Sequence, residues 1–261
     1  MCVLYGKKET GMVNVGLVGY GKAGMAVAEV LVADPRYSLR WVARRQEEAN
    51  GASVAVGTQV VPTLTLASSH LGDWLDEYPV DAVVDFSRPQ AVQMYGEALR
   101  RRGVALVSAI SAYSEDELAY VRGLGQDIRV MASPNITLGI NFLILAAKLL
   151  RGIAPFADVE VLEQHFREKP EVSGTARKIA ESLNLEEDRI TSLRLGGIVG
   201  HHEVIFGFPY QTVRLIHNAI KREAFGTGVA FALAELLNQP AGFYTFDDLL
   251  MARVRHDLVH S

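Results

Sequence analysis

The chain has 261 residues, of which 49% are hydrophobic and 21% are charged, and its formal net charge at pH 7 is −4. This composition is typical of a folded globular protein, and the length suits one large domain or two modest ones. The acidic balance argues against a nucleic-acid partner, because a protein that binds nucleic acid needs a surface with concentrated positive charge. The one dense basic run, at 100–102, is typical of the C-terminal end of a helix.

The beginning of the chain and its longest apolar stretch argue against secretion and membrane insertion. Cys2 is the single cysteine, so no disulfide can form within the chain, and we expect a reducing, cytoplasmic location. Residues 1–11 lack the apolar region of a secretory signal, and Met12 precedes the first strand, so we interpret them as an extension or a misassigned start. The apolar stretch 136–150 contains a polar and a charged residue and is too short to span a bilayer.

Strand-like and helix-like segments alternate from residue 13 to residue 133. Apolar runs typical of strands buried on both faces lie at 13–18, 39–43, 81–87, 104–109 and 128–133. Helices are predicted between them at 23–33, 89–102 and 114–124. Ser114 and Glu117 have the spacing of a capping box. This alternation predicts right-handed βαβ units and a Rossmann-type parallel sheet.

The pattern changes after residue 135. A helix at 137–150, a half-exposed strand at 158–166, a helix at 173–183, several β segments within 189–217 and a helix at about 218–237 predict an α+β domain with an open mixed or antiparallel sheet. We therefore predict two domains. Residues 12–135 form a dinucleotide-binding domain rejoined by 238–261, and residues 136–237 form a substrate-binding and oligomerisation domain.

A glycine-rich turn, V-G-Y-G-K-A-G, joins the first strand to the first helix. Gly19 permits the tight turn, Gly21 lets the backbone approach a pyrophosphate, and Gly24 lets the helix pack closely on the strand. A plain strand–helix turn is the less favoured alternative, because the motif directly follows a buried strand. The predicted cofactor contacts in this turn are Gly19, Tyr20, Gly21, Lys22, Ala23 and Gly24.

The second strand ends in Arg44 and Arg45, where an NAD site usually carries an acid for the ribose 2′-hydroxyl. Two guanidinium groups suit a 2′-phosphate, so we predict NADPH as the cofactor, with NADH possible. The alternative, in which the arginines are exposed and the acid lies elsewhere, stays open because Glu47 and Glu48 follow.

Three later loops share the carboxyl edge of the predicted sheet, where open α/β folds bind ligands. The predicted cofactor contacts in them are Phe86, Ser108, Ala109, Ile110, Ser133, Pro134, Asn135 and Ile136.

Residues 164–176 combine a titratable side chain, a cation and a helix start. Ser173 is expected to cap the helix with its hydroxyl, which leaves the first-turn N–H groups of 174–176 free to bind a carboxylate. Lys169 adds a positive charge, and His165 suits proton transfer near neutral pH. The alternative is an exposed strand histidine, a surface lysine and an ordinary cap, and from spacing alone that alternative is slightly favoured.

A metal site is not predicted. His201 and His202 are adjacent, but neighbouring residues on a strand point to opposite faces, and no further ligands lie at suitable spacing. We interpret both as strand residues.

From about residue 13 to residue 250 the chain resembles the bacterial dihydrodipicolinate reductase family. The segments that carry the resemblance are VVDFSRP, ASPNITLGINFLILAAKLL, EQHFREKPEVSGTA, LRLGGIVGHHEVIFG, IHNAIKREAFGTGVAFA and FYTFDDLL. Their order along most of the chain makes the resemblance far more specific than any single motif.

The resemblance implies a function for the residues at 164–176. His165 matches the family's proton donor, Lys169 its catalytic lysine, and Ser173, Gly174 and Thr175 its substrate-carboxylate turn. The implied reaction is hydride transfer from NAD(P)H to an unsaturated, imine-derived ring that carries two carboxylates, in lysine and diaminopimelate biosynthesis. The family also implies a homotetramer joined through the second domain.

Four positions depart from the family pattern. Phe166 replaces a second histidine that contacts the substrate, residues 170–172 form a turn one residue shorter, residues 108–111 replace a G-T-T-G loop, and residues 19–24 carry the general glycine motif. These departures leave two alternatives. One is a reductase or dehydrogenase of a different imine or amino-acid-like substrate, and the other is a non-catalytic dinucleotide-binding regulatory protein.

Overall fold

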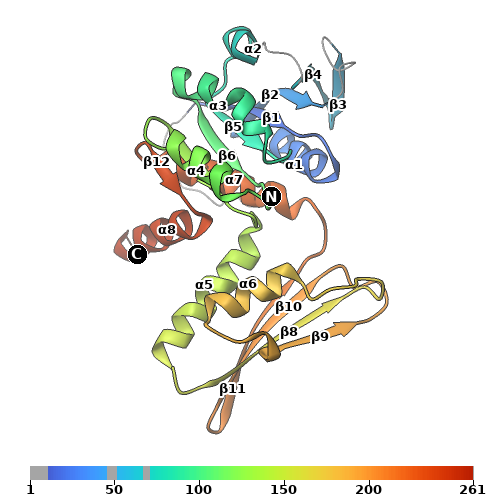
Figure 1. Cartoon of the computed structure of the whole chain (residues 1–261), viewed down its shortest axis with the longest axis vertical. Helices are drawn as coiled ribbons and strands as arrows, with labels where there is room; N and C mark the ends of the chain where they lie inside the picture. Colours follow the sequence, from blue (N-terminus) through green and yellow to red (C-terminus); the bar gives the residue numbers. More distant parts are fainter. Residues whose placement is uncertain (1–10, 46–51, 67–70, 261) are drawn as a thin grey trace. The chain divides into compact units, whose positions relative to one another are not determined.

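The computed structural model describes residues 11–45, 52–66 and 71–260, and its backbone contacts separate the chain into two compact units (Figure 1). The first unit contains the chain up to Ile136 together with the segment from Phe225 onward, and the second contains Thr137–Ala224. The expectations for Cys2 and the tail up to residue 10, and for Glu47 and Glu48, lie outside the described residues.

The first unit is built on a Rossmann-type sheet, as the sequence predicts. Its strand order is β12-β7-β6-β5-β1-β2-β4-β3, and every pairing is parallel except that of β3 with β4. The strands are β1 (Val13–Val18), β2 (Tyr37–Arg44), β3 (Ser53–Val56), β4 (Gln59–Thr65), β5 (Ala82–Asp85), β6 (Ala105–Ser108), β7 (Arg129–Ala132) and β12 (Gly242–Tyr244).

Helices connect these strands. They are α1 (Lys22–Ala33), α2 (Leu71–Glu77), α3 (Ala91–Arg102), α4 (Glu115–Leu124), α7 (Ala224–Leu236) and α8 (Phe246–His260). The capping box of Ser114 and Glu117 at the start of α4 is confirmed, and so is the basic last turn of α3. The sequence did not predict β3, β4, α2, β12 or α8.

Burial explains the central strands. The side chains of β5 and β6 are buried along their whole length, as are the last four of β1, which agrees with helices covering both sheet faces. Gly16 lies against the fully buried ring of Trp41, and a Cβ atom at Gly16 would sit 2.1 Å from that ring. The absence of a side chain at position 16 therefore makes room for the indole in the core.

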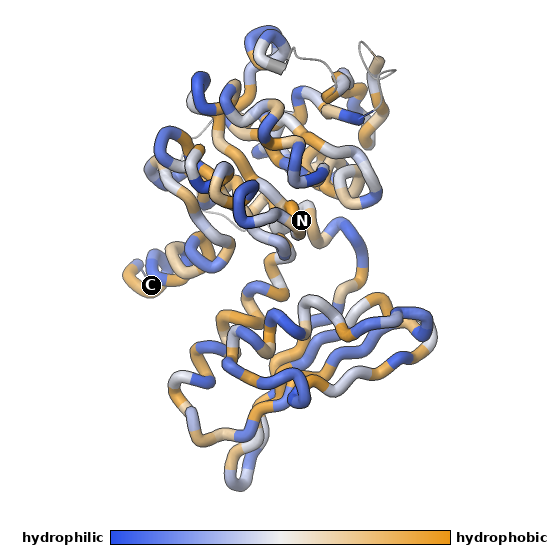
Figure 2. The backbone as a smooth tube through the Cα atoms, viewed as in Figure 1, coloured by the Kyte–Doolittle hydropathy of each residue, from blue (hydrophilic) through white to orange (hydrophobic). Residues whose placement is uncertain are grey.

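The second unit is an α+β structure with a mixed four-stranded sheet. Its strand order is β11-β10-β8-β9, in which β8 and β9 are parallel and the other pairs antiparallel. Its elements are α5 (Leu138–Ile153), β8 (Asp158–His165), α6 (Gly174–Ser182), the short helix η2 (Glu187–Arg189), β9 (Ile190–Arg194), β10 (His201–Phe208) and β11 (Gln211–Asn218). In Figure 2 hydrophobic and hydrophilic residues alternate along these strands.

One face of this sheet is packed and apolar. Ile144 of α5, Ile179 of α6, Val161 of β8 and Phe206 of β10 belong to a single buried cluster. The regular alternation of exposed and buried positions in β8 places Val159, Val161, Glu163 and His165 on that packed face. A carboxylate and a histidine therefore continue a row of core positions.

The domain boundary near the C-terminal end differs from the prediction. The sequence assigned a helix at 218–237 to the second domain, but β11 runs to Asn218, and α7 packs within the first unit. The Tyr37 hydroxyl donates to the Ala230 carbonyl at 2.6 Å, and Gly226 lies directly against Val30 of α1. An apolar helical pattern shows that a helix is buried, but it does not show which domain the helix packs against.

Among the described residues, no helix combines the length and the apolarity that a bilayer span requires.

The packing of α7 on α1 generates a testable prediction. A Cβ atom at Gly226 would lie 2.4 Å from the Val30 Cβ, so Gly226→Ala should destabilise the protein by about 1–3 kcal/mol through overpacking. Gly123→Ala in α4 is the matched control, because nothing lies within 4 Å of its Cβ position and it carries the same gain in helix propensity. Calorimetric unfolding of both variants measures the difference, and equal stability would show that α7 does not pack tightly on α1.

Candidate active site

The turn between β1 and α1 has the backbone geometry that its glycines are predicted to supply. Gly19 has φ +90°, and a Cβ atom there would lie 2.6 Å from the Phe86 backbone. A Cβ atom at Gly24 would lie 2.0 Å from the Gly19 carbonyl oxygen. Gly21 is the N-cap of α1, no side chain caps that helix, and nothing lies within 4 Å of the Gly21 Cβ position. The first N–H groups of α1 are thus left open to an anion.

A cavity of about 590 Å³ lies beside this turn, within the first unit. It brings together the predicted residues Gly19, Tyr20, Gly21, Arg44, Arg45 and Phe86. The Arg44 guanidinium lies 5.2 Å from the centre of the Tyr20 ring, a distance suited to a cation–π contact. Lys22, Ala23 and Gly24 follow within α1 and do not line the cavity.

Arg88 is a third arginine of this cavity, and the sequence prediction missed it. Its position directly after the D-F-S segment, at the same edge of the sheet as Phe86, was a usable signal. The loop that carries it is held by Asp85, which is fully buried at the end of β5. Asp85 accepts hydrogen bonds from the Ser87 N–H at 2.7 Å, from the Ser87 hydroxyl at 2.6 Å and from the Tyr95 hydroxyl.

The remaining predicted cofactor residues lie at the ends of β6 and β7 and do not line the cavity. The Ser108 hydroxyl is 2.8 Å from the Tyr113 hydroxyl, and Ile110 is buried behind Ala109. The Ser133 hydroxyl donates to the Asn135 carbonyl at 2.6 Å, which closes the turn that contains Pro134 and leads to the buried Ile136. These contacts shape the two loops.

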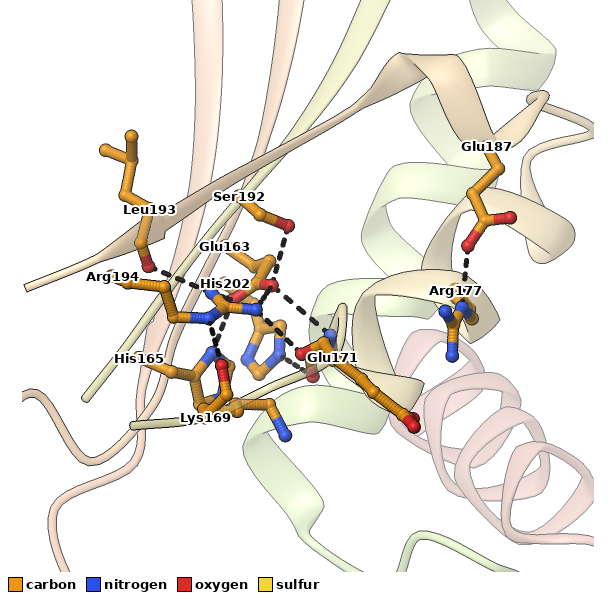
Figure 3. A network of polar contacts seen from close by, with 11 residues as sticks. Glu163, His165, Lys169, Glu171, Arg177, Glu187, Ser192, Leu193, Arg194 and His202 are labelled. Atoms are coloured by element: carbon orange, nitrogen blue, oxygen red, sulfur yellow. Dashed lines mark hydrogen bonds and ion pairs between the residues drawn. The ribbon is translucent and has the colours of Figure 1, made fainter. Parts of the chain in front are cut away.

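The second unit contains a dense polar network around Glu163 of β8, shown in Figure 3. Arg194, at the end of β9, donates to both carboxylate oxygens of Glu163, at 2.8 and 3.0 Å. The Ser192 hydroxyl donates at 2.7 Å and the Ser173 N–H at 3.2 Å, and the Glu163 carboxylate also contacts His165 Nδ1. Sequence reasoning missed both Glu163 and Arg194.

These hydrogen bonds determine the ionisation of Glu163. Burial by itself would raise the pKa of this carboxyl group, but the hydrogen bonds from Arg194, Ser192, His165 and the Ser173 N–H outweigh burial and lower the pKa to about 2. Glu163 is therefore a carboxylate, which can only accept hydrogen bonds. It follows that His165 Nδ1 carries a hydrogen and that Nε2 is the ring nitrogen through which His165 can exchange a proton.

Gly200 borders the other side of the His165 ring. A Cβ atom at Gly200 would lie 3.3 Å from His165 Nε2. Glycine at this position therefore leaves space next to the nitrogen that the Glu163 contact makes available.

Arg194 also holds the backbone between His165 and Ser173. Its Nε donates to the Lys169 carbonyl at 2.9 Å, and its Nη2 donates to the Glu171 carbonyl at 2.7 Å. One guanidinium thus links the buried carboxylate to two carbonyls of the turn between His165 and Ser173. Lys169 is half-buried in this turn, and the Phe166 side chain is 42% exposed at its start.

Ser173 occupies the N-cap of α6 as predicted, but the prediction that its hydroxyl caps the helix is wrong. No side-chain hydrogen bond caps α6, and the Ser173 Oγ lies 2.9 Å from His202 Nε2 instead. Gly174 and Thr175 follow in the first turn, so the predicted carboxylate turn has open N–H groups.

The two neighbouring histidines of β10 point to opposite faces, as predicted, but His202 is not an ordinary strand residue. It is buried beside Glu163 in the strand register, and its ring is edge-on to that of His165 with centroids 5.2 Å apart. His201 contacts Asn218 instead, at 2.7 Å. Within the described residues, no group of His, Cys, Asp and Glu side chains is arranged to hold a metal ion.

Two family models match the chain. The model described as "Dihydrodipicolinate reductase, N-terminus" matches residues 13–136, and "Dihydrodipicolinate reductase, C-terminus" matches residues 135–250. The chain is 35% identical over 196 residues to the 4-hydroxy-tetrahydrodipicolinate reductase of Caldanaerobacter subterraneus subsp. tengcongensis, covering 65% of this chain and 76% of that protein. It is 33% identical over 176 residues to that of Thermosipho africanus, covering 67% and 80%.

Solved structures show the same fold. Dipicolinate-bound dihydrodipicolinate reductase from Paenisporosarcina sp. TG-14 matches with a TM-score of 0.74 and 21% identity, covering 90% of this chain and 97% of that chain. Amine dehydrogenase from Mycobacterium smegmatis matches with a TM-score of 0.65 and 12% identity, covering 90% and 95%.

The Glu163–Arg194 pair generates a stability prediction. Arg194→Ala leaves a buried carboxylate without its main partner and should cost about 3–5 kcal/mol of unfolding free energy. Arg177→Ala is the matched control, because Arg177 pairs with Glu187 at the surface, at 2.7 Å, and surface pairs contribute about 0–1 kcal/mol. Urea unfolding of the two variants measures both values, and a loss below about 1 kcal/mol for Arg194→Ala would contradict this account.

Proposed function

Because the chain belongs to the dihydrodipicolinate reductase family, we propose that it reduces a dihydrodipicolinate-type ring, an imine-derived dicarboxylate, in the pathway to diaminopimelate and lysine. The observation that carries this proposal is that both family domains occur in order along one chain whose second unit assembles His165 and Ser173 around a buried Glu163. The chain is thus an oxidoreductase of the NAD(P)H-dependent type.

The first unit has the features of a dinucleotide site. The uncapped start of α1 offers N–H groups to a pyrophosphate, and Gly19 keeps the turn free of side-chain atoms. When bound, the nicotinamide cofactor supplies the hydride. The glycine turn between β1 and α1 holds the dinucleotide, and residues of the second unit carry out proton transfer.

Within the second unit, some residues are proposed to transfer a proton and others to bind the charged groups of the substrate. His165, with Nδ1 fixed on Glu163, is proposed to deliver a proton from Nε2 to the substrate as the hydride arrives. Lys169 stabilises negative charge on the substrate, and the turn Ser173–Thr175 binds a carboxylate with backbone N–H groups at the start of α6. The Glu163 carboxylate, whose charge is balanced by Arg194, keeps the His165 ring in one orientation with a hydrogen on Nδ1.

We propose NADPH as the preferred cofactor, with NADH as the alternative. Three arginines, Arg44, Arg45 and Arg88, line the cavity beside the glycine turn. Guanidinium groups match the geometry of a phosphate bidentately, whereas the 2′-hydroxyl of NADH needs an acceptor.

A second substrate class is favoured by one observation. Phe166 exposes 42% of its surface next to His165, and a phenyl ring can contact an apolar group but cannot donate a hydrogen bond to a carboxylate. An imine with one carboxylate and a more apolar arm would use that surface. The non-catalytic alternative is disfavoured, because models of both domains of a reductase family match the chain.

Assembly and location are proposed on the family resemblance alone. We propose a homotetramer in the cytoplasm, with a small dicarboxylate as the partner molecule and neither nucleic acid nor membrane as a partner.

The catalytic proposal predicts separate effects on turnover and cofactor binding. His165→Ala should lower kcat for NADPH oxidation with freshly generated dihydrodipicolinate substrate about 10²–10⁴-fold and leave the Kd for NADPH unchanged. Lys169→Ala should lower kcat/KM, because the variant lacks the positive charge that is proposed to stabilise negative charge on the substrate. His256→Ala, in α8, is the control and should behave as the wild type. A wild-type protein that binds NADPH and turns over other imines only would support the second substrate class.

The cofactor proposal predicts a selective loss of NADPH affinity. Arg44→Ala and Arg88→Ala should each raise the Kd for NADPH roughly 10–100-fold, the equivalent of a charged hydrogen bond, and change the Kd for NADH less than about threefold. Arg40→Ala is the matched control, because Arg40 is exposed on the same strand as Arg44 and does not line the cavity. Fluorescence titration with both nucleotides decides the matter, and equal losses for the two would exclude a 2′-phosphate contact.

A further inference from the structure

The Ser173 hydroxyl is directed away from the helix that it would ordinarily cap. Serine at an N-cap usually accepts a hydrogen bond from the second or third residue of the helix. Here no such bond forms, and the oxygen lies 2.9 Å from His202 Nε2. Ser173 is 4% exposed and His202 is 6% exposed, so this contact is a buried one and water does not substitute for it.

His202 belongs to a polar row that crosses the sheet of the second unit. In the strand register, His202 of β10 pairs with His217 of β11 on one side and with Glu163 of β8 on the other, and Glu163 pairs with Ser192 of β9. His202 therefore lies between Glu163, which contacts His165, and Ser173, the N-cap of α6. Among the described residues, its Nδ1 is buried and has no hydrogen-bond partner.

The surroundings keep the His202 ring neutral. Burial is the largest cause that lowers the pKa of His202. The neighbouring His165 and His217 lower it further, and together these causes bring it to about 3 in spite of the opposing charge of Glu163. A neutral imidazole carries one hydrogen, on either Nδ1 or Nε2. The two tautomers give the Ser173 hydroxyl opposite roles.

Burial of Nδ1 decides between the tautomers. If Nδ1 carried the hydrogen, a buried N–H would lack an acceptor, and buried N–H groups without a partner are rarer than under-used acceptors. If Nε2 carries the hydrogen, the N–H is satisfied by the Ser173 oxygen, and only a lone pair on Nδ1 stays unused. In the second arrangement the Ser173 oxygen accepts the hydrogen bond from His202, so the Ser173 hydroxyl hydrogen can be donated to another acceptor.

We propose that His202 is a positioning residue whose Nε2–H donates to the Ser173 oxygen, so that the Ser173 hydroxyl in turn donates to a substrate carboxylate. This inference rests on the proposed function, in which the turn Ser173–Thr175 binds a carboxylate. It makes the hydroxyl hydrogen and the open N–H groups of α6 a single set of donors. Because Phe166 offers no donor, the Ser173 hydroxyl carries a larger share of carboxylate recognition than the family pattern implies.

The tautomer is measured directly by two-bond ¹H–¹⁵N correlation spectra of the ¹⁵N-histidine-labelled full chain. The signals of His202 are assigned by their absence in His202→Gln. A hydrogen on Nε2 with a bare Nδ1 is expected at pH 7, and a hydrogen on Nδ1, or a doubly protonated ring, would overturn the proposal. This readout needs no turnover, so it is distinct from a failure of the proposed reductase activity, which NADPH oxidation by the wild type reports separately.

A double-mutant cycle tests the link through Ser173. The probe is dipicolinate, titrated calorimetrically in the presence of NADPH, and KM and kcat are measured beside it. Ser173→Ala and His202→Leu should each raise the dipicolinate Kd and the substrate KM about tenfold with kcat changed less than about threefold. The double variant should be no worse than Ser173→Ala, because His202 acts through that hydroxyl.

Two further variants separate positioning from folding. His202→Gln retains an N–H donor near the Nε2 position and should recover most of the lost affinity. His201→Gln, on the adjacent residue that faces the other side of the sheet, should leave the dipicolinate Kd unchanged. Additive losses in the double variant, or a His202→Gln variant as impaired as His202→Leu, would show that His202 has no role in carboxylate binding.

Discussion

The buried ion pair of Glu163 and Arg194 is the interaction on which the second unit's site depends. Glu163 is fully buried on the packed face of β8, and Arg194 reaches it from the end of the neighbouring parallel strand. The same guanidinium donates to the carbonyls of Lys169 and Glu171. Removing it would leave a buried carboxylate without its main partner and would release two carbonyls of the backbone between His165 and Ser173, so this one side chain supports both the carboxylate and the turn.

A buried ion pair is weak evidence for stability as such, because desolvation of both charges opposes their attraction. What this pair supplies is geometry. Glu163 fixes the His165 ring at Nδ1 and accepts from the Ser173 N–H, while Arg194 fixes the backbone that carries Lys169. The turn between His165 and Ser173 keeps these groups together, since two of its carbonyls are held by the same side chain that balances the charge of the carboxylate.

The sequence predicts features that depend on local pattern and misses those that depend on strand register. The strand at 13–18, the capping box of α4 and the glycine turn follow from residues close together in the chain, and the structure agrees. Arg194 and His202 become functional neighbours of Glu163 only through the pairing of β8 with β9 and β10, which no periodicity encodes. The assignment of α7 to the second domain failed for another reason, because an apolar helical pattern does not show which unit the helix packs against. One signal was available: Glu163 occupies an inward position in the alternation of β8, where a carboxylate requires partners.

The saturation of Glu163 explains how an acidic residue can lie at the centre of the site that we propose for an anionic substrate. Its two oxygens accept five hydrogen bonds, from two Arg194 nitrogens, the Ser192 hydroxyl, the Ser173 N–H and His165 Nδ1. A carboxylate offers about four lone-pair sites, so no acceptor remains to face a ligand. Its charge is balanced by Arg194, and the donors that surround it are Lys169 and the N–H groups at the start of α6. The dicarboxylate that we propose as substrate would therefore meet hydrogen-bond donors and positive charge, although the residue that orders them is negative.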